Sequence, residues 1–262
     1  MPKLFLVILA LSALSEVLAQ DAWPWAKYGL PQSDLATCTP LKRVDWADGY
    51  HQAMLVREKK PDLQLVFLGD SITMMWRSQS GYEGGTPVWQ QFYAPRNAGN
   101  FGISGDRTEH ILWRITEGGD LDGLNPKVLV LLIGINNYGQ THSTPQDVSA
   151  GIATIVGYLK TKLPETKILL LGVFPCNDRP ENPVREWVRQ VNSRIKPLAD
   201  RQRVWYLDIG DKFVEPDGTI TKEKLRDLLH LSEKGYWIWA ETMEPYLVDL
   251  LDNGGKGDIW GK

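Results

Sequence analysis

Short apolar runs alternate along this chain with longer segments in which apolar residues recur every three or four positions. Continuous apolar runs are typical of parallel strands buried on both faces, and they predict five strands over 63–68, 98–103, 128–133, 168–174 and 204–209. A helix is expected over 44–59, and helical stripes lie between the later strands, for example Val148, Ile152, Ile155, Val156 and Leu159. This alternation predicts an α/β fold, a three-layer α/β/α sandwich around a five-stranded parallel sheet with right-handed crossovers.

A glycine, an acid and a serine directly follow the first predicted strand. Gly69 allows a sharp turn there, which places Ser71 at the start of a helix. Backbone N–H groups at a helix start are unpaired and carry partial positive charge, so they can stabilise an oxyanion beside such a serine. An Asp-Ser pair in this position is also a common helix cap. Taken alone, the motif is consistent with a nucleophile or with a cap.

Near the end of the chain, an aspartate stands three residues before a histidine, in the segment Asp227-Leu228-Leu229-His230. At that spacing one turn of chain can bring both side chains to the same face, so that the carboxylate bonds one ring nitrogen. A hydrolytic serine needs a base that takes its proton and a third group that orients the base. The segment therefore predicts that His230 is the base, that Asp227 orients it, and that Ser71 is the nucleophile.

Two further strand ends carry hydrogen-bond donors. Gly105 follows the second predicted strand and offers its backbone N–H, and Asn136 follows the third and offers its side-chain amide. With the N–H of Ser71 they would supply three donors to a developing oxyanion, and removing one such donor typically costs about 100- to 1,000-fold in rate. Each residue alone also fits an ordinary turn glycine or loop asparagine. Because open α/β sheets place their sites at the carboxyl edge, we expect all these strand ends to converge there.

The order Ser71, Gly105, Asn136 and His230 resembles the SGNH, or GDSL-type, hydrolases, whose sequence blocks are named for these residue types. Within that superfamily the chain resembles most the catalytic subunits of type Ib platelet-activating factor acetylhydrolase. The segments that carry this resemblance are 100–114, 125–127, 136–137, 182–186, 217–220 and 230–232. The resemblance implies a flavodoxin-like sheet and a carboxylic ester hydrolase of the acetylesterase type that needs no cofactor.

The same resemblance assigns residue roles. It implies a triad of Ser71, His230 and Asp227, and an oxyanion hole made by Ser71, Gly105 and Asn136. The chain departs from the usual pattern at two positions. Ile72 replaces the leucine that usually follows the serine, and Leu228 replaces the glycine or tyrosine that is common after the aspartate. Neither change removes a catalytic group.

Three bulky side chains flank the predicted catalytic residues: Ile72, Ile135 and Leu229. An acyl group lying between the nucleophile and the oxyanion hole would touch them. In the resembling subgroup the matching positions wall a short acyl pocket, so branched isoleucines at two of them favour acetyl over a long chain. The sequence therefore predicts substrate-binding roles for these residues, although ordinary core packing would also explain apolar side chains there.

Composition and the first residues bear on domain organisation and location. The 262 residues, 43% of them hydrophobic, suffice for one domain, which we place at 44–252 between an N-terminal arm (20–43) and a flexible tail (253–262). The net charge of −3, without a basic patch, argues against a nucleic-acid partner. Residues 1–19 combine Lys3, an apolar stretch over 4–13 and a small-residue end at Ala19, which is typical of a cleaved signal peptide. The apolar stretch is far shorter than the roughly 20 residues that span a bilayer, so we expect a secreted or periplasmic protein without stable membrane insertion.

The two cysteines, Cys38 and Cys176, leave a disulfide open as one possibility and two unpaired thiols as the other. Their spacing excludes a Cys-x-x-Cys metal motif, and no metal is expected. The resemblance also makes a homodimer possible.

The leaving alcohol is suggested by less direct features. The segment 77–87 is extra relative to the animal acetylhydrolase subunits, which act inside cells, and it is bracketed by Trp76 and Trp89. Tryptophans near the site could form platforms for sugar rings, although large aromatic side chains usually pack into the core. Exported relatives in the superfamily often deacetylate polysaccharides, so a carbohydrate O-acetyl ester is the expected substrate. A lipid acetylhydrolase, lysophospholipase or thioesterase remains an alternative, and a non-catalytic carbohydrate-binding protein a weaker one.

Overall fold

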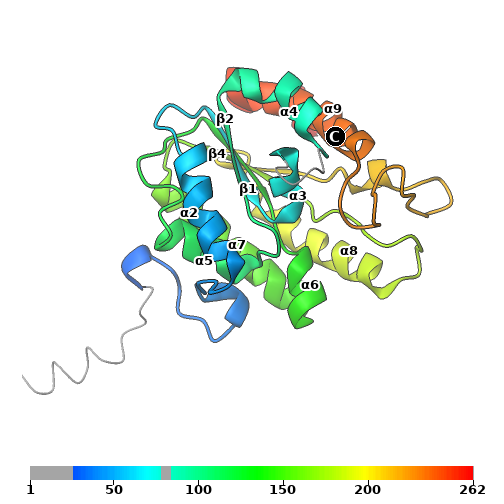
Figure 1. Ribbon diagram of the computed structural model, residues 1–262, viewed down its shortest axis with the longest axis horizontal. Coiled ribbons are helices and arrows are strands. Elements are labelled where there is room, and N and C mark those ends of the chain that lie inside the picture. The colour runs from blue at the N-terminus through cyan, green and yellow to red at the C-terminus, as the bar shows by residue number, and fades with distance from the viewer. Residues whose placement is uncertain (1–25, 78–83, 262) are drawn as a thin grey trace, which may run out of the picture.

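The computed structural model describes residues 26–77 and 84–261 of the chain. Its centre is a five-stranded parallel sheet with the strand order β2-β1-β3-β4-β5 (Figure 1). This is the flavodoxin-like order, and it confirms the predicted fold class. The strands are β1 (Leu65–Gly69), β2 (Ala98–Gly102), β3 (Val128–Leu132), β4 (Lys167–Leu171) and β5 (Val204–Leu207).

Helices cover both faces of the sheet. Figure 1 shows α4 and α9 side by side on one face, while α2, α5 and α7 group on the other, where α7 also packs against α8. The apolar stripe of α7 predicted from the sequence is buried. The helices are α2 (Trp46–Glu58), α3 (Ser71–Met74), α4 (Thr86–Phe92), α5 (Thr108–Thr116), α6 (Ile135–Thr141), α7 (Pro145–Lys162), α8 (Pro183–Ile195) and α9 (Glu233–Val248).

The fourth strand is shorter than the sequence pattern predicts. Apolar residues continue to Phe174, but β4 ends at Leu171. Its neighbour β5 ends at Leu207, and beyond Gly172 the backbone of Val173 bonds a side chain instead: the amide of Asn192 accepts from its N–H at 2.8 Å and donates to its carbonyl oxygen at 3.0 Å. Residues after Leu171 stay buried although they no longer pair with a neighbouring strand. An apolar run in the sequence indicates burial and does not show where the strand ends.

The nucleophile turn is packed so closely that it needs glycine on both neighbouring strands. A Cβ at Gly69 would lie 2.4 Å from the carbonyl oxygen of Leu132, and one at Gly102 would lie 2.1 Å from the backbone nitrogen of Met74. These distances are shorter than real contacts allow. The two glycines therefore let α3 lie directly against the ends of β1 and β2.

The N-terminal arm is anchored to the domain. Its described part contains two short 3-10 helices, Ala26–Tyr28 and Ala36–Cys38. The Thr37 hydroxyl donates to the carbonyl oxygen of Asp147 at 2.7 Å, and the N–H of Leu41 donates to the carbonyl oxygen of Glu109 at 3.0 Å. The arm thus crosses α5 and α7 before α2 begins.

The structure bears on only some of the expectations about the ends of the chain and the cysteines. Cys38 and Cys176 are both buried free thiols, and no disulfide joins them. In the expected tail, Trp260 packs against Trp205 and its indole N–H donates to Asp249 at 2.7 Å, so the mobility of 253–262 stays a prediction. The leader 1–19 lies outside the described residues. Within the described part of the chain, every helix is too short or too polar to cross a bilayer.

Candidate active site

Ser71, His230 and Asp227 form one hydrogen-bonded chain. The Ser71 Oγ lies 3.0 Å from His230 Nε2, and His230 Nδ1 lies 2.7 Å from Asp227 Oδ2. Because an ionised carboxylate only accepts hydrogen bonds, Nδ1 carries the ring proton and leaves Nε2 free to accept from the serine hydroxyl. The structure therefore brings together, over 159 positions of sequence, the three side chains that the motifs predicted.

The serine is held at the start of α3 by its neighbours. Asp70 caps this helix, with its Oδ1 accepting from the N–H of Ile72 at 2.9 Å. On the far side of the turn, the Tyr236 hydroxyl donates to the carbonyl oxygen of Ile72 at 2.8 Å. The cap and the nucleophile were alternative interpretations of one motif, and the structure shows Asp70 as the cap while Ser71 faces His230.

The histidine is positioned by a tight loop. Asp227 Oδ1 accepts from the backbone N–H groups of Leu229 at 3.1 Å and His230 at 2.7 Å, so the same carboxylate orients both the backbone and the ring. Leu228 has a φ of +68°, a left-handed conformation that glycine adopts without cost. The leucine here therefore carries a conformational cost that a glycine would avoid. The carbonyl oxygen of Leu228 accepts from the N–H of Asn177 at 2.7 Å, which fastens the loop to the segment after β4.

The predicted oxyanion donors gather at the same edge. Gly105 lies in the loop after β2 with a φ of +82°, a conformation that favours glycine. Asn136, at the start of α6, donates through Nδ2 to the carbonyl oxygen of Asp106 at 2.9 Å, and the same nitrogen lies 3.4 Å from Asp70 Oδ2. Nδ2 carries two hydrogens, and one of them donates to Asp106. The contact of the other hydrogen to Asp70 is long and weak, so that hydrogen is available to a stronger acceptor.

Two carboxyl groups of the site have pKa values moved in opposite directions. Complete burial raises the pKa of Asp70 to about 7, because burial penalises the charged form more than the bond from the Ile72 N–H stabilises it, and the nearby Asp106 adds to the rise. Partial burial would raise the pKa of Asp227 as well, but the bonds from the His230 ring and backbone outweigh it and lower that pKa. Asp227 is therefore suited to stay ionised beside the histidine.

His110 also lies near the site without the features of a base. Its Nδ1 accepts from the N–H of Arg107 at 3.1 Å and lies 3.9 Å from Asp106 Oδ1. Burial, followed by the charge of Arg107, lowers its pKa to about 4, so the ring is neutral at pH 7. His110 and Asp106, four residues apart in sequence, therefore form a supporting pair beside the site.

An open groove of about 480 Å³ borders the site at Asp227 and Asn136. Two of the three predicted acyl-contacting side chains, Ile135 and Leu229, line it, whereas Ile72 does not. Ile72 is 2% exposed and Ile135 6% exposed, and both belong to the core cluster. The groove is lined by Ile135, Asn136, Tyr138, Gly139, Cys176, Asn177, Asn182, Val184, Asp227, Leu228 and Leu229.

The tryptophans that bracket the extra segment do not form a platform. Trp76 and Trp89 are at most 1% exposed and pack with Phe67, Tyr93 and Trp239 in an aromatic cluster. Core packing, the plainer of the two interpretations, holds for both. Residues 78–83 of that segment lie outside the described part of the chain. The aromatic side chain that does line the groove is Tyr138, whose ring contacts Trp187.

Several residues of the site are missed by sequence reasoning. Arg43 and Arg114 contact the loop that carries Gly105. Arg43 follows no predicted strand and belongs to no motif, whereas Arg114 ends the stretch 100–114 that carried the family resemblance. Asn177 and Asn182 line the groove from the segment after β4, and Asn182 opens a stretch that carried the family resemblance, which is a usable signal. Within the two described ranges, no cluster of three His, Cys, Asp or Glu side chains could hold a metal ion.

A serine, a histidine and a carboxylate hydrogen-bonded in this order, at the carboxyl edge of a parallel sheet, define the class of serine hydrolases by geometry. Comparison with known proteins gives the family. The family model of the GDSL-like Lipase/Acylhydrolase family matches residues 67–238. The chain is 35% identical over 225 residues to platelet-activating factor acetylhydrolase IB subunit alpha1 of Homo sapiens, covering 84% of this chain and 92% of that protein. It is 34% identical over 209 residues to the alpha2 subunit of Rattus norvegicus, covering 79% of this chain and 85% of the relative.

Solved structures share the fold. A GDSL-like lipase from Bacteroides thetaiotaomicron superposes with a TM-score of 0.59 at 20% identity, covering 79% of this chain and 96% of that one. An acetylxylan esterase mutant from Geobacillus stearothermophilus gives 0.53 at 20% identity, covering 73% and 94%. The chain belongs to the GDSL-like lipase/acylhydrolase family and is a carboxylic ester hydrolase.

Proposed function

We propose that this protein is an exported serine esterase that removes acetyl groups from carbohydrates. The observation that carries the chemistry is the chain from Ser71 Oγ through His230 to Asp227, with contacts of 3.0 and 2.7 Å. His230 takes the proton of Ser71 as the oxygen attacks the ester carbonyl, and Asp227 stabilises the imidazolium that forms. The proton then passes to the leaving alcohol, which leaves an acetyl-enzyme.

Water repeats the attack on the acetyl-enzyme with His230 again as the base, and acetate is released. In both steps the carbonyl oxygen becomes an oxyanion, which preorganised hydrogen-bond donors must stabilise. The N–H groups of Ser71 and Gly105 and the amide of Asn136 are the proposed donors. The Asn136 hydrogen that makes the weak contact to Asp70 at 3.4 Å is the one we assign to the oxyanion.

The lining of the groove supports a neutral, hydroxyl-rich alcohol. It presents the side-chain amides of Asn136, Asn177 and Asn182 and the phenol of Tyr138, groups that both donate and accept hydrogen bonds. Among the described residues that line it there is no lysine or arginine, the side chains that bind phosphate best. Its volume of about 480 Å³ lies in the range of small-molecule sites. These features favour a sugar over a phospholipid headgroup.

A lipid acetyl ester is the second candidate, because the relatives at 34–35% identity are named platelet-activating factor acetylhydrolases. The name of the acetylxylan esterase that shares the fold points instead to a carbohydrate. Both names include an acetyl group, so both support acetyl as the acyl group of the substrate. The proposal for the alcohol depends on the lining of the groove.

Acetate release separates the candidates. The mature protein, residues 20–262, is assayed with acetylated xylan, an acetylated alkyl phospholipid, and 4-nitrophenyl acetate and octanoate, with Ser71→Ala as the control. Serine-dependent release from xylan and from the small acetate supports the proposal. Release from the phospholipid but not from xylan favours the lipid enzyme, and faster release of octanoate than acetate favours a long-chain esterase or thioesterase. Binding of xylan with no serine-dependent release from any ester would indicate a carbohydrate-binding protein.

Export is proposed from the leader at 1–19 alone. Expression of the full chain in a Gram-negative host, followed by fractionation and N-terminal sequencing, tests it. Cleavage after Ala19 with the product in the periplasm or medium is expected, and an intact leader in the cytoplasm would contradict it. The homodimer implied by the resemblance stays a prediction that gel filtration with light scattering can check.

A further inference from the structure

Three successive carbonyl oxygens in the loop after β2 are each held by a side chain from outside the loop. Arg43 Nη1 donates to the carbonyl oxygen of Ser104 at 2.5 Å, Gln140 Nε2 to that of Gly105 at 3.1 Å, and Asn136 Nδ2 to that of Asp106 at 2.9 Å. Arg43 belongs to the N-terminal arm, and the other two belong to α6. The loop is therefore oriented from outside, one peptide at a time.

The first of these bonds acts on the peptide that matters for catalysis. The carbonyl oxygen of Ser104 and the N–H of Gly105 belong to the same peptide group. In a trans peptide these two groups point in opposite directions, so fixing the oxygen also fixes where the N–H points. Arg43 holds the oxygen on its own side, which directs the Gly105 N–H away from the arm.

Without an anchor this peptide would be free to turn over. A flip of the Ser104–Gly105 peptide changes ψ of Ser104 and φ of Gly105, and a glycine accepts either sign of φ. The observed φ of +82° at Gly105 is one of the two states open to it. The flipped state would place a carbonyl oxygen where the proposed oxyanion hole needs a donor, and would repel the developing charge.

Arg43 is itself held rigidly. Its guanidinium pairs with Asp45 at 2.5 Å and with Asp106 Oδ1 at 3.3 Å, and it lies over the Trp46 ring at 5.3 Å. A Cβ added to Gly105 would lie 3.3 Å from Arg43 Nη1, so the guanidinium rests directly against the loop. The Arg43 side chain is 15% exposed, which leaves it in reach of small solutes.

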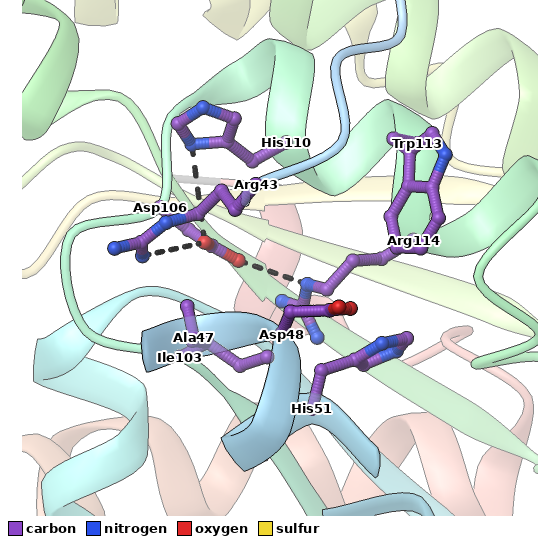
Figure 2. Close-up of a pocket in the computed structure, with 9 residues that line it drawn as sticks. All are labelled: Arg43, Ala47, Asp48, His51, Ile103, Asp106, His110, Trp113 and Arg114. Atoms are coloured by element: carbon purple, nitrogen blue, oxygen red, sulfur yellow. Dashed lines mark hydrogen bonds and ion pairs between the residues drawn. The ribbon is translucent and has the colours of Figure 1, made fainter. Parts of the chain in front are cut away.

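A second arginine ties this arrangement to the nucleophile strand. Figure 2 shows the Asp106 carboxylate between Arg43 and Arg114, and Arg114 Nε lies 2.8 Å from Asp106 Oδ2. Arg114 Nη2 also donates to the carbonyl oxygen of Gly69 at 3.2 Å, just before Asp70 and Ser71. Its Nη1 pairs with Asp120 at 2.6 Å. The loop with Gly105 and the turn with Ser71 thus share one buried anchor.

We propose that Arg43 is a positioning residue that locks the Ser104–Gly105 peptide in the orientation in which the Gly105 N–H faces the oxyanion. Its charge at the carbonyl oxygen also polarises the peptide and strengthens the N–H as a donor. Arg43 lies in the N-terminal arm, outside the segment 67–238 that the family model matches. The inference rests on the proposed roles of Ser71 and Gly105, and it holds for any ester substrate.

The test compares Arg43→Met with Lys42→Met. Lys42 is the neighbouring cation on the arm, paired with Asp48 at 3.1 Å, and it touches neither the loop nor the catalytic chain. With 4-nitrophenyl acetate we expect Arg43→Met to lower kcat about 10- to 100-fold, somewhat less than the loss of a whole oxyanion donor. KM should stay within a factor of two, and Lys42→Met should match the parent.

Two further measurements separate positioning from general damage to the fold. A boronic acid forms a tetrahedral adduct when the Ser71 oxygen adds to its boron, with the serine proton passing to His230. Affinity for such an inhibitor should fall in Arg43→Met as much as kcat falls, because both depend on the oxyanion donors. In Arg43→Ala, which leaves room beside the loop, added guanidinium ion should restore part of the activity, whereas a misfolded variant would not respond. If Arg43→Met does not fold, Arg43→Lys takes its place, because it keeps the charge but cannot bond Ser104, Asp45 and Asp106 in the same planar geometry. It should also lower kcat while KM stays within a factor of two, and the fall in kcat should be smaller.

The outcomes are distinguishable. A folded Arg43→Met with unchanged kcat, or a loss confined to KM, would overturn the inference. Equal losses in Arg43→Met and Lys42→Met would do the same, since they would indicate a general charge effect. If Ser71→Ala kept its activity in this assay, the proposed catalytic function would fail, and Arg43 would not be the cause.

Discussion

The side-chain amide of Asn136 donates to the carbonyl oxygen of Asp106 at 2.9 Å, which joins the start of α6 to the loop after β2. In the proposed mechanism Asn136 has two tasks at the carboxyl edge of the sheet. It orients the loop after β2, and its second N–H hydrogen serves the oxyanion. The proposed oxyanion hole is therefore a connected structure, and damage to one donor should reach the others.

Replacing Asn136 tests this connection. Asn136→Ala removes a proposed donor and releases the Asp106 carbonyl, so we expect kcat to fall at least 100- to 1,000-fold, about the cost of one donor or more. Gln140→Ala is the matched control, because Gln140 bonds the adjacent carbonyl oxygen of Gly105 at 3.1 Å from a more exposed position. Its kcat should fall less than tenfold. Similar losses in the two variants would show that loop support, rather than oxyanion binding, is the main role of Asn136.

The left-handed conformation of Leu228 leads to a second prediction. Such a conformation costs an L-residue about 1–2 kcal/mol, and a β-branched side chain more. Leu228→Gly should therefore keep kcat within about twofold of the parent, because glycine adopts this conformation without strain. Leu228→Val should destabilise the protein by about 1–3 kcal/mol and lower kcat, because the strained loop carries Asp227 and His230. Urea unfolding and steady-state kinetics measure both effects, and equal behaviour of the two variants would contradict the prediction.

The buried carboxyl of Asp70 leads to a prediction about pH and stability. Its folded-state pKa of about 7 lies above the value of 3.8 expected in the unfolded chain. Between these values the folded protein holds a proton that the unfolded chain has released, so the free energy of unfolding should fall as the pH rises. The slope from this one group is at most about 1.4 kcal/mol per pH unit, and its contribution is greatest below the lower pKa.

Asp70→Asn isolates this effect. The amide oxygen can still accept from the Ile72 N–H, so the cap is kept while the titration is removed. Other carboxyl groups, such as Asp227 with its lowered pKa, make the free energy of unfolding rise with pH. Their contributions are the same in the variant and the parent, so they cancel in the comparison. Urea unfolding from pH 4 to 8 should show the variant gaining stability relative to the parent as the pH rises toward 7. Parallel curves would contradict the assignment.

The acyl preference depends on Ile135, which lines the groove and is 6% exposed. Ile135→Ala removes three carbon atoms beside the proposed acyl position, so longer acyl chains should be admitted. With 4-nitrophenyl esters from acetate to octanoate, we expect kcat/KM for octanoate relative to acetate to rise about tenfold or more, within the range that one or two methylene-sized gaps produce. An unchanged ratio would remove Ile135 from the acyl pocket. Ile72→Val is the control, because the Ile72 side chain does not line the groove and should not alter the preference.

Much of the fold and of the catalytic set could be derived from the sequence alone. The five strands and the stripe of α7 follow from periodicity, which reflects how each segment is buried. Ser71, Gly105 and Asn136 could be found because each directly follows a strand, and parallel strands bring their ends to one edge. The pair Asp227 and His230 could be found because its geometry is local, within one turn of chain. In each case the relevant interaction lies within a few residues or follows from the topology.

Other features were decided only by the tertiary structure. Arg43 and Arg114 have long side chains whose partners, such as Ser104 and Asp106, depend on how separate segments pack. Trp76 and Trp89 could equally have lined a sugar site, and only the packing of α4 and α9 placed them in the core. The groove is built from three segments that are distant in sequence. Local patterns determine what each segment can form, whereas the contacts between segments depend on distances that no local pattern contains.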